Sequence, residues 1–160
     1  MPNKIKTLEE MKELLNEFRK ENKRLVTTNG SFDILHYAHV NLLEKAKKEG
    51  DILIVLLNSD SSIKRIKGEK RPIISEIERA HILSSLESVD YIIIFNDETP
   101  LELLKQLKPN VHVKGGSFVP EKVKEEKNLI ESFGGKHIIF EIEDGFSTTN
   151  IIEKIISLYS

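Results

Sequence analysis

Two histidines lie three residues apart, His36 and His39, shortly after the segment Thr28-Asn29-Gly30-Ser31-Phe32-Asp33. At the start of a helix this spacing lets both imidazole rings face one point, at the positive end of the helix dipole. Two imidazoles and free backbone N–H groups suit a phosphate whose negative charge grows during a reaction. Gly30 permits a close approach by such a ligand. The alternative is structural, with one histidine capping the helix and the other packing.

Three hydroxyl residues, Ser147, Thr148 and Thr149, follow Gly145 at the expected start of the last helix. At a helix start, side-chain oxygens and unpaired N–H groups together can bind an anion. Ordinary N-capping is the alternative, but it needs only one of the three. Together with the histidine pair, the hydroxyl cluster favours phosphate binding.

Cationic side chains follow two further strands. Lys67 and Arg71 lie in Lys67-Gly68-Glu69-Lys70-Arg71-Pro72, and Lys114 precedes Gly115-Gly116. The first run is either a solvated surface loop or a clamp on an anionic second substrate. The chain contains neither of the common glycine-rich phosphate loops, G-x-x-x-x-G-K-[ST] and G-x-G-x-x-G, so any phosphate must be bound by other means.

The elements that must position these residues alternate along the chain. β-rich runs are predicted at 25–28, 52–57, 91–95, 111–113 and 137–140, and helices at 39–49, 75–86, 120–132 and 148–158, with further helices opened by Thr7 and Thr99. This alternation predicts an α/β, Rossmann-like, doubly wound five-stranded parallel sheet with helices on both faces. Ligands of such sheets lie beyond the carboxyl ends of the strands, where the strand order reverses. The polar segments described above all follow predicted strands.

Length and composition predict one domain over residues 1–160, with a leading helix and link at 1–24 and the α/β core at 25–160. The net charge of -2 gives no basic excess, so we expect neither nucleic-acid nor membrane-surface binding. Without cysteine there is no disulfide, thiol nucleophile or Cys-ligated zinc. No apolar run reaches membrane-span length and no secretory segment opens the chain, so a cytoplasmic protein is expected. His81, His112 and His137 are predicted to be structural, and no metal-binding residue is predicted.

The residues Gly30-Ser31-Phe32-Asp33, His36, His39 and Ser147-Thr148-Thr149 resemble the cytidylyltransferase-like branch of the nucleotidyltransferase α/β phosphodiesterase superfamily. Its marks are G-x-F-D-x-x-H-x-G-H near the start and G-x-S-T-T near the end. Within it, the chain is most similar to the heptose-1-phosphate adenylyltransferases, which make ADP-heptose for the lipopolysaccharide inner core. The similarity runs almost end to end and includes Asn58-Ser59-Asp60, Lys67-Gly68, Arg71-Pro72, Thr99-Pro100-Leu101-Glu102 and Val113-Lys114-Gly115-Gly116.

Three positions depart from the family's pattern: Ala38 replaces a glycine, Ser31 a cysteine and Ser117 an aspartate. Ala38 would narrow the nucleotide pocket, and Ser117 would remove a sugar or metal contact. Many relatives are fused to a sugar kinase, so the resemblance implies that a separate kinase supplies the sugar phosphate here. Relatives often dimerise, and the apolar last helix is compatible with a homodimer and equally with core packing.

The resemblance implies in-line attack by the phosphate of D-glycero-D-manno-heptose 1-phosphate on the α-phosphorus of ATP, with pyrophosphate leaving. Mg²⁺ would arrive with the ATP. His36 and His39 would contact the triphosphate and its transition state, and Asp33 would brace their loop. The expected nucleotide-binding residues are Asn29, Gly30, Ser31, Phe32, His36, His39, Gly145, Ser147, Thr148 and Thr149, and those for the second substrate's phosphate are Lys67, Arg71 and Lys114.

Other functions are compatible with the same motifs. The nearest is a glycerol-3-phosphate or related cytidylyltransferase using CTP. Such relatives carry an arginine three residues before the glycine of the terminal motif, where this chain has Ile142, so ATP is expected here. More remote alternatives are a regulatory nucleotide-binding domain without turnover, which the intact histidine pair disfavours, and a bare assembly module, which would need neither motif.

Overall fold

The computed structural model describes residues 3–116, 120–141 and 145–160, and within them five parallel strands form one sheet in the order β3-β2-β1-β4-β5. The strands are β1 (Leu25–Gly30), β2 (Ile52–Asn58), β3 (Tyr91–Phe95), β4 (Val111–Gly115) and β5 (Lys136–Phe140). All pairings are parallel. The fold prediction is confirmed: β3 has its predicted ends, and the other four strands are present with ends that differ by one or two residues.

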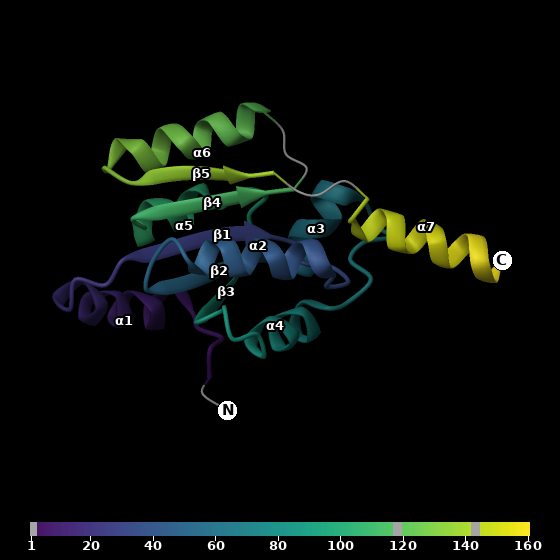
Figure 1. Cartoon of the computed structure of the whole chain (residues 1–160), viewed down its shortest axis with the longest axis horizontal. Helices are drawn as coiled ribbons and strands as arrows, with labels where there is room; N and C mark the ends of the chain where they lie inside the picture. Colours follow the sequence, from purple (N-terminus) through teal and green to yellow (C-terminus); the bar gives the residue numbers. More distant parts are fainter. Residues whose placement is uncertain (1–2, 117–119, 142–144) are drawn as a thin grey trace.

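Helices cover both faces of the sheet, as Figure 1 shows. One core includes residues of α2 (Tyr37–Lys47) and α4 (Glu76–Ser84) packed on β1, β2 and β4. The other includes residues of α1 (Leu8–Lys20), α5 (Leu101–Leu107) and α6 (Pro120–Ser132) packed on the opposite face. Residues 53–57 of β2 are all fully buried, because this strand is covered on both sides.

Three local features differ from the predictions. Residues Asp60–Lys67, for which no helix is predicted, form helix α3, and Ser59 caps it by accepting from the Ser62 N–H. Helix α2 begins at Tyr37 and not at His39. Thr99, expected to open a helix, is not the N-cap of α5: Pro100 has that position and makes no side-chain cap bond.

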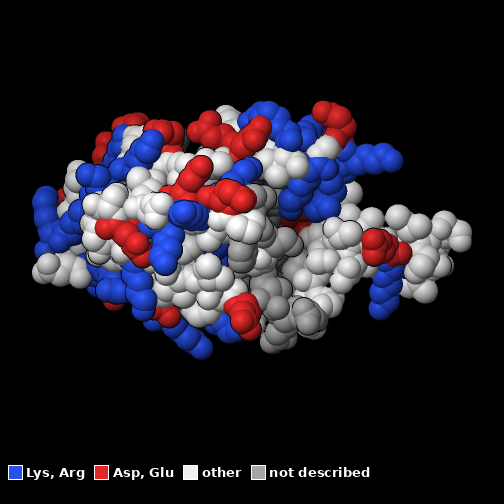
Figure 2. All heavy atoms as spheres, turned by 90° about the horizontal axis from the view of Figure 1, so that it is seen from above, with Lys and Arg blue, Asp and Glu red and all other residues white. Residues whose placement is uncertain are grey.

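The last helix, α7 (Thr148–Tyr159), extends away from the body of the molecule in Figure 1. Its exposed apolar residues are Ile155, Ile156, Leu158 and Tyr159. Seen from above in Figure 2, positive and negative side chains are interspersed over the body, whereas α7 is mostly uncharged. Of the helices in the described part of the chain, none combines the length and apolarity needed to cross a membrane.

The strand order reverses beside β1, because β2 pairs with one of its edges and β4 with the other. The segments after β1 and β4 therefore flank the switch point, where ligands of doubly wound sheets bind. These are the segments that carry the histidine pair and Lys114. The fold thus brings together two of the sequence segments expected to bind phosphate.

Arg79 on α4 is fully buried and joins several segments at this edge of the sheet. Its guanidinium donates to the carbonyl oxygens of Ile74, Ser31 and Asn58 at 2.9, 2.6 and 2.8 Å. A fourth bond, of 2.8 Å, goes to the Asp60 carboxylate. Because these acceptors lie after β1, at the end of β2, at the start of α3 and before α4, one side chain holds together the segments around the candidate site.

We predict that Arg79→Met lowers the free energy of unfolding by about 3 kcal/mol, because buried acceptors of a charged donor lose their partner. Urea unfolding followed by circular dichroism measures this loss. The matched control is Arg65→Met, which removes an arginine that is about half exposed and pairs with Glu98 at 3.9 Å. It should cost less than about 1 kcal/mol. Equal losses in the two variants would refute the central role of Arg79.

Candidate active site

The loop after β1 holds two non-glycine residues with positive φ, Phe32 at 48° and Ile34 at 50°. This uncommon backbone conformation is stabilised by the buried carboxylate of Asp33, which lies between the two residues. Asp33 accepts from the N–H groups of Ile73 and Ile74 at 2.9 and 3.0 Å, and from Arg71 Nε at 2.8 Å. Burial alone raises the pKa of Asp33, but these donors outweigh it and bring the pKa below its ordinary value. Asp33 thus ties the β1 loop to the segment before α4, as expected of a brace.

His36 and His39 are stacked on each other at the amino end of α2. Their ring centroids are 3.7 Å apart, and the ring planes differ by 23°. The backbone N–H of His36, the N-cap residue, donates to His39 Nδ1 at 3.4 Å. The Phe32 ring packs against the His39 ring with a centroid distance of 5.2 Å. The structure therefore brings the two predicted histidines to one place and one orientation.

Both histidines are neutral at physiological pH. Burial lowers the pKa of His36, and burial, the adjacent His36 ring and the Lys67 charge lower the pKa of His39 to about 3. Because His39 Nδ1 accepts a hydrogen bond, its proton lies on Nε2, which is a donor. An arriving anion favours the protonated forms and so draws the pair toward positive charge. Such a pair suits a phosphate whose charge increases.

The hydroxyl cluster begins α7 and contacts the β1 loop. Ser147 is the N-cap and accepts from the Asn150 N–H at 3.0 Å. Thr148 is buried and donates its hydroxyl to the Asp33 carbonyl, so that hydrogen is not available to a phosphate. Thr149 is exposed, so its side chain is open to solvent at the first turn of α7.

The predicted cations differ in their surroundings. Arg71 binds Asp33 and is only 15% exposed, so it has a bracing role first. Lys67 ends α3 and stays exposed; its pKa is lowered, first by partial desolvation and then by the Arg71 charge. Lys114 Nζ lies 3.0 Å from Glu126 Oε1 and 3.4 Å from Asn29 Oδ1. Lys114 therefore bridges the β1 and β4 sides of the switch point.

Two of the β1-loop residues expected to line a nucleotide, Phe32 and Ser31, have groups that are already engaged within the protein. Phe32 is 5% exposed and belongs to the core, so its ring is not at the surface. The Ser31 carbonyl is held by Arg79. A Cβ on Gly30 would lie 3.0 Å from the Phe32 ring, which explains the glycine there. Ser117 and Ile142, which carried expectations about sugar and nucleotide choice, lie outside the described residues.

Sequence reasoning missed Arg79 and Glu126. Both are charged residues within otherwise apolar positions of amphipathic helices: Glu126 lies between Val123 and Ile130 on the buried side of α6. The sequence signal that could have identified them is a charged residue at a helix position that faces the core. Such a residue must have buried partners, because a buried unpaired charge is costly.

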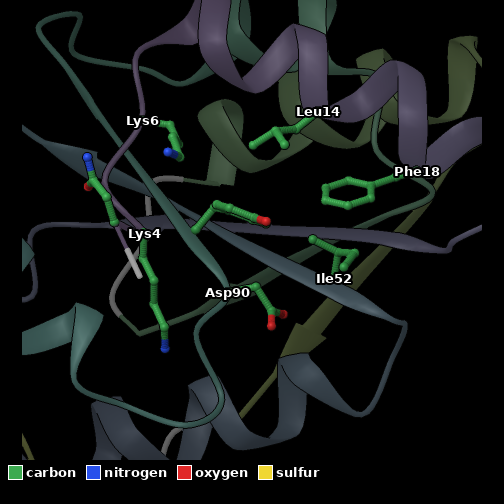
Figure 3. A pocket seen from close by; sticks show the side chains of 8 residues that line it. Lys4, Lys6, Leu14, Phe18, Ile52 and Asp90 are labelled. Carbon is green, nitrogen blue, oxygen red and sulfur yellow. The ribbon is translucent and has the colours of Figure 1, made fainter. Parts of the chain in front are cut away.

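A surface pocket shown in Figure 3 lies elsewhere on the molecule. It is lined by Lys4, Lys6, Leu14, Phe18, Ile52, Asp90 and neighbours. Ile52 and Tyr91 begin β2 and β3, so this pocket is at the amino ends of the strands. Because ligands of such sheets bind at the carboxyl ends, we do not assign it to the active site.

The low pKa of His39 predicts a pH-dependent stability. The unfolded chain binds a proton near pH 6.5, whereas folded His39 does so only near pH 3. The contribution of neutral His39 to the free energy of unfolding is therefore complete above pH 6.5 and is lost as the pH falls toward 3. Urea unfolding between pH 7.5 and 5 should show a shallower pH dependence for His39→Asn than for wild type. His81→Asn, an exposed control on α4, should keep the wild-type slope; an unchanged slope in His39→Asn would contradict the assignment.

Comparison with known proteins identifies the family. Residues 27–154 match the family model described as cytidylyltransferase-like. The bifunctional protein HldE of Syntrophotalea carbinolica is 49% identical over 98% of this chain and 32% of its own length; that of Geobacter metallireducens is 50% identical with the same coverage. The chain thus spans about a third of the length of these relatives.

Two solved structures share the fold. The lipopolysaccharide core biosynthesis protein from Thermoplasma volcanium has a TM-score of 0.62 and 30% identity, covering 76% of this chain and 97% of that one. Pantoate-beta-alanine ligase from Francisella tularensis has a TM-score of 0.68 at 18% identity, covering 97% and 78%. Given the family match over most of its length and the histidine pair at the switch point, the chain belongs to the cytidylyltransferase-like family.

Proposed function

We propose that this chain is a nucleotidyltransferase that joins AMP from ATP to D-glycero-D-manno-heptose 1-phosphate, giving ADP-heptose and pyrophosphate. The observation that carries the proposal is the stacked, neutral His36–His39 pair at the amino end of α2, beside the switch point. Two similarities support a sugar phosphate as the substrate class. The bifunctional HldE proteins match over 98% of this chain, and a lipopolysaccharide core biosynthesis protein has a similar structure.

The reaction needs positioning more than proton transfer. An oxygen of the sugar phosphate forms a bond to the α-phosphorus of ATP while the bond from that phosphorus to the bridging oxygen breaks, and pyrophosphate leaves. The attacking oxygen is already anionic, so no general base is required. Catalysis then comes from alignment and from donors placed where charge develops in the transition state.

The site residues divide this work. His36 and His39 would donate to the α-phosphate and its pentacoordinate transition state. The backbone of residues 29–31 would line the nucleotide, and Thr149 with the first turn of α7 would hold the departing phosphates. Lys67, whose side chain is exposed, is the leading candidate to bind the phosphate of the sugar substrate. Arg71 and Lys114 would assist this binding while they stay paired with Asp33 and Glu126.

Mg²⁺ fits this site as a companion of ATP. The Asp33 carboxylate, close to the histidine pair in sequence, already accepts three N–H donors, so the phosphate oxygens would supply most of the metal's ligands. When bound, Mg²⁺ would neutralise part of the triphosphate charge.

The partners follow from the same chemistry. The phosphate of a sugar 1-phosphate is supplied by a kinase-class reaction, which we assign to a separate sugar kinase. The relatives are bifunctional and about three times longer than this chain, which is compatible with a second activity outside the part that this chain matches. The exposed apolar side of α7 supports a homodimer. A cytoplasmic location is part of the same proposal.

Replacing either histidine should slow turnover with little effect on folding. A lost donor to transition-state charge typically costs ~10²–10³ in kcat. We therefore predict that His36→Asn and His39→Asn each lower kcat by at least ~100-fold, measured as pyrophosphate release. His81→Asn, on the exposed side of α4, is the matched control and should retain wild-type kcat. Near-normal turnover in both active-site variants would remove the catalytic assignment.

The substrate proposal is tested by pairing ATP and CTP with heptose 1-phosphate and glycerol 3-phosphate, with pyrophosphate as the readout. ATP with heptose 1-phosphate should have the highest kcat/KM, because Ile142 cannot supply the arginine contact of cytidylyl-type relatives. Turnover only of CTP with glycerol 3-phosphate would replace the proposal with the cytidylyltransferase alternative. Nucleotide binding without turnover of any pair would indicate a regulatory domain.

A further inference from the structure

A row of polar side chains crosses the neighbouring strands β1, β4 and β5. Thr27 on β1 pairs in register with His112 on β4, and His112 pairs with His137 on β5. Glu126 of α6 faces the two histidines. The side chains of His112, His137 and Glu126 are 0, 1 and 3% exposed. This His112–Glu126–His137 cluster is a set of potential metal ligands inside an otherwise apolar layer, and the proposed reaction does not use it.

The atoms of the cluster face one another without bonding. Glu126 Oε2 lies 3.6 Å from His112 Nε2 and 3.6 Å from His137 Nε2, which is longer than a hydrogen bond. Each of the three atoms is buried and has no hydrogen-bond partner within the described part of the chain. All three lie within 4.8 Å of one another. Leaving buried polar atoms unpaired is costly, so the arrangement calls for a shared partner at its centre.

A transition-metal ion fits that centre. Metal–nitrogen and metal–oxygen bonds of about 2.0–2.1 Å place donors around a four-coordinate ion roughly 3.4 Å apart, close to the spacing of Glu126 Oε2 from each ring. Thr27 Oγ1 lies 2.8 Å from His112 Nδ1, where it can accept the ring N–H and direct Nε2 inward. Such outer bonds orient most metal-binding histidines.

The outer contacts of the cluster leave its central atoms free for a ligand. Glu126 binds Lys114 through its other oxygen, Oε1, which accepts from Lys114 Nζ at 3.0 Å, so Oε2 faces the two rings. A metal ion binds imidazole and carboxylate ligands in their unprotonated forms, and the adjacent ammonium group of Lys114 favours the ionised carboxylate.

We propose that His112 Nε2, Glu126 Oε2 and His137 Nε2 bind one divalent transition-metal ion of the zinc class, separate from the nucleotide site. Two imidazoles and one carboxylate favour Zn²⁺, Co²⁺ or Ni²⁺ over Mg²⁺, which prefers oxygen ligands. The ion clamps α6 to β4 and β5. Through Glu126 it also fixes Lys114, which reaches Asn29 at the switch point. This departs from the sequence-based expectation that both histidines are merely structural.

The test is metal binding by the purified full chain after treatment with a chelator. In excess Mg²⁺, wild type should bind one equivalent of Co²⁺, with the visible absorption of a four-coordinate ion, and Zn²⁺ should displace it and raise Tm. Glu126→Gln and His137→Asn should each raise Kd by at least ~100-fold. The controls are His81→Asn and the double variant His36→Asn/His39→Asn, which should bind as wild type does.

Three results would overturn the proposal: no stoichiometric binding by wild type, binding that survives both cluster variants, or binding that is lost with His36 and His39. The first would mean that the three groups are linked by hydrogen bonds or water. Because cluster variants could misfold, X-ray absorption of the Zn²⁺ complex of the His36→Asn/His39→Asn protein gives an independent readout. It should show two imidazole ligands, and a shell of oxygen alone would also overturn the proposal.

Discussion

Arg79 places a permanent positive charge inside the protein, and oxygen atoms of the surrounding segments compensate for it. Removing a guanidinium from water is costly unless its donors are paired with good geometry. Its partners are three carbonyls and the Asp60 carboxylate, which lie after β1, at the end of β2, at the start of α3 and before α4. Those segments can relax only by leaving the charge unpaired. The ligand edge of the sheet is therefore held in one arrangement before any ligand arrives.

The buried negative charge of Asp33 constrains the β1 loop in a similar way. Asp33 accepts from Arg71 and from two backbone N–H groups, and its own carbonyl accepts from Thr148. The β1 loop is thus tied on one side to the segment before α4 and on the other to the start of α7. This explains how residues far apart in the chain, the histidine pair and the terminal hydroxyl cluster, belong to one site. Positive φ values at Phe32 and Ile34 are maintained by these bonds.

The fold and the proximity of His36 to His39 could be predicted from the sequence because both depend on local patterns. Apolar β-rich runs alternating with capped helices predicted the sheet, and the spacing of His36 and His39 predicted a shared orientation, which their stacking confirms. Roles that depend on long-range partners could not be predicted. Thr148 donates its hydroxyl to a residue 115 positions away, and Arg71 donates its Nε–H to one 38 positions away, so these two groups already have partners within the protein. Likewise, only the register of β4 and β5 brings His112 and His137 together.

The central claim is that a nucleotide binds with its phosphates against the His36–His39 pair. The chain has five histidines, so the imidazole nitrogens of ¹⁵N-histidine-labelled protein can be followed individually by NMR. On titration with a non-hydrolysable ATP analogue and Mg²⁺, the ring signals of His36 and His39 should shift toward the protonated form, because the bound anion favours it. The signal of His81 on exposed α4 should not move. Nucleotide binding that leaves both His36 and His39 unshifted would contradict the account.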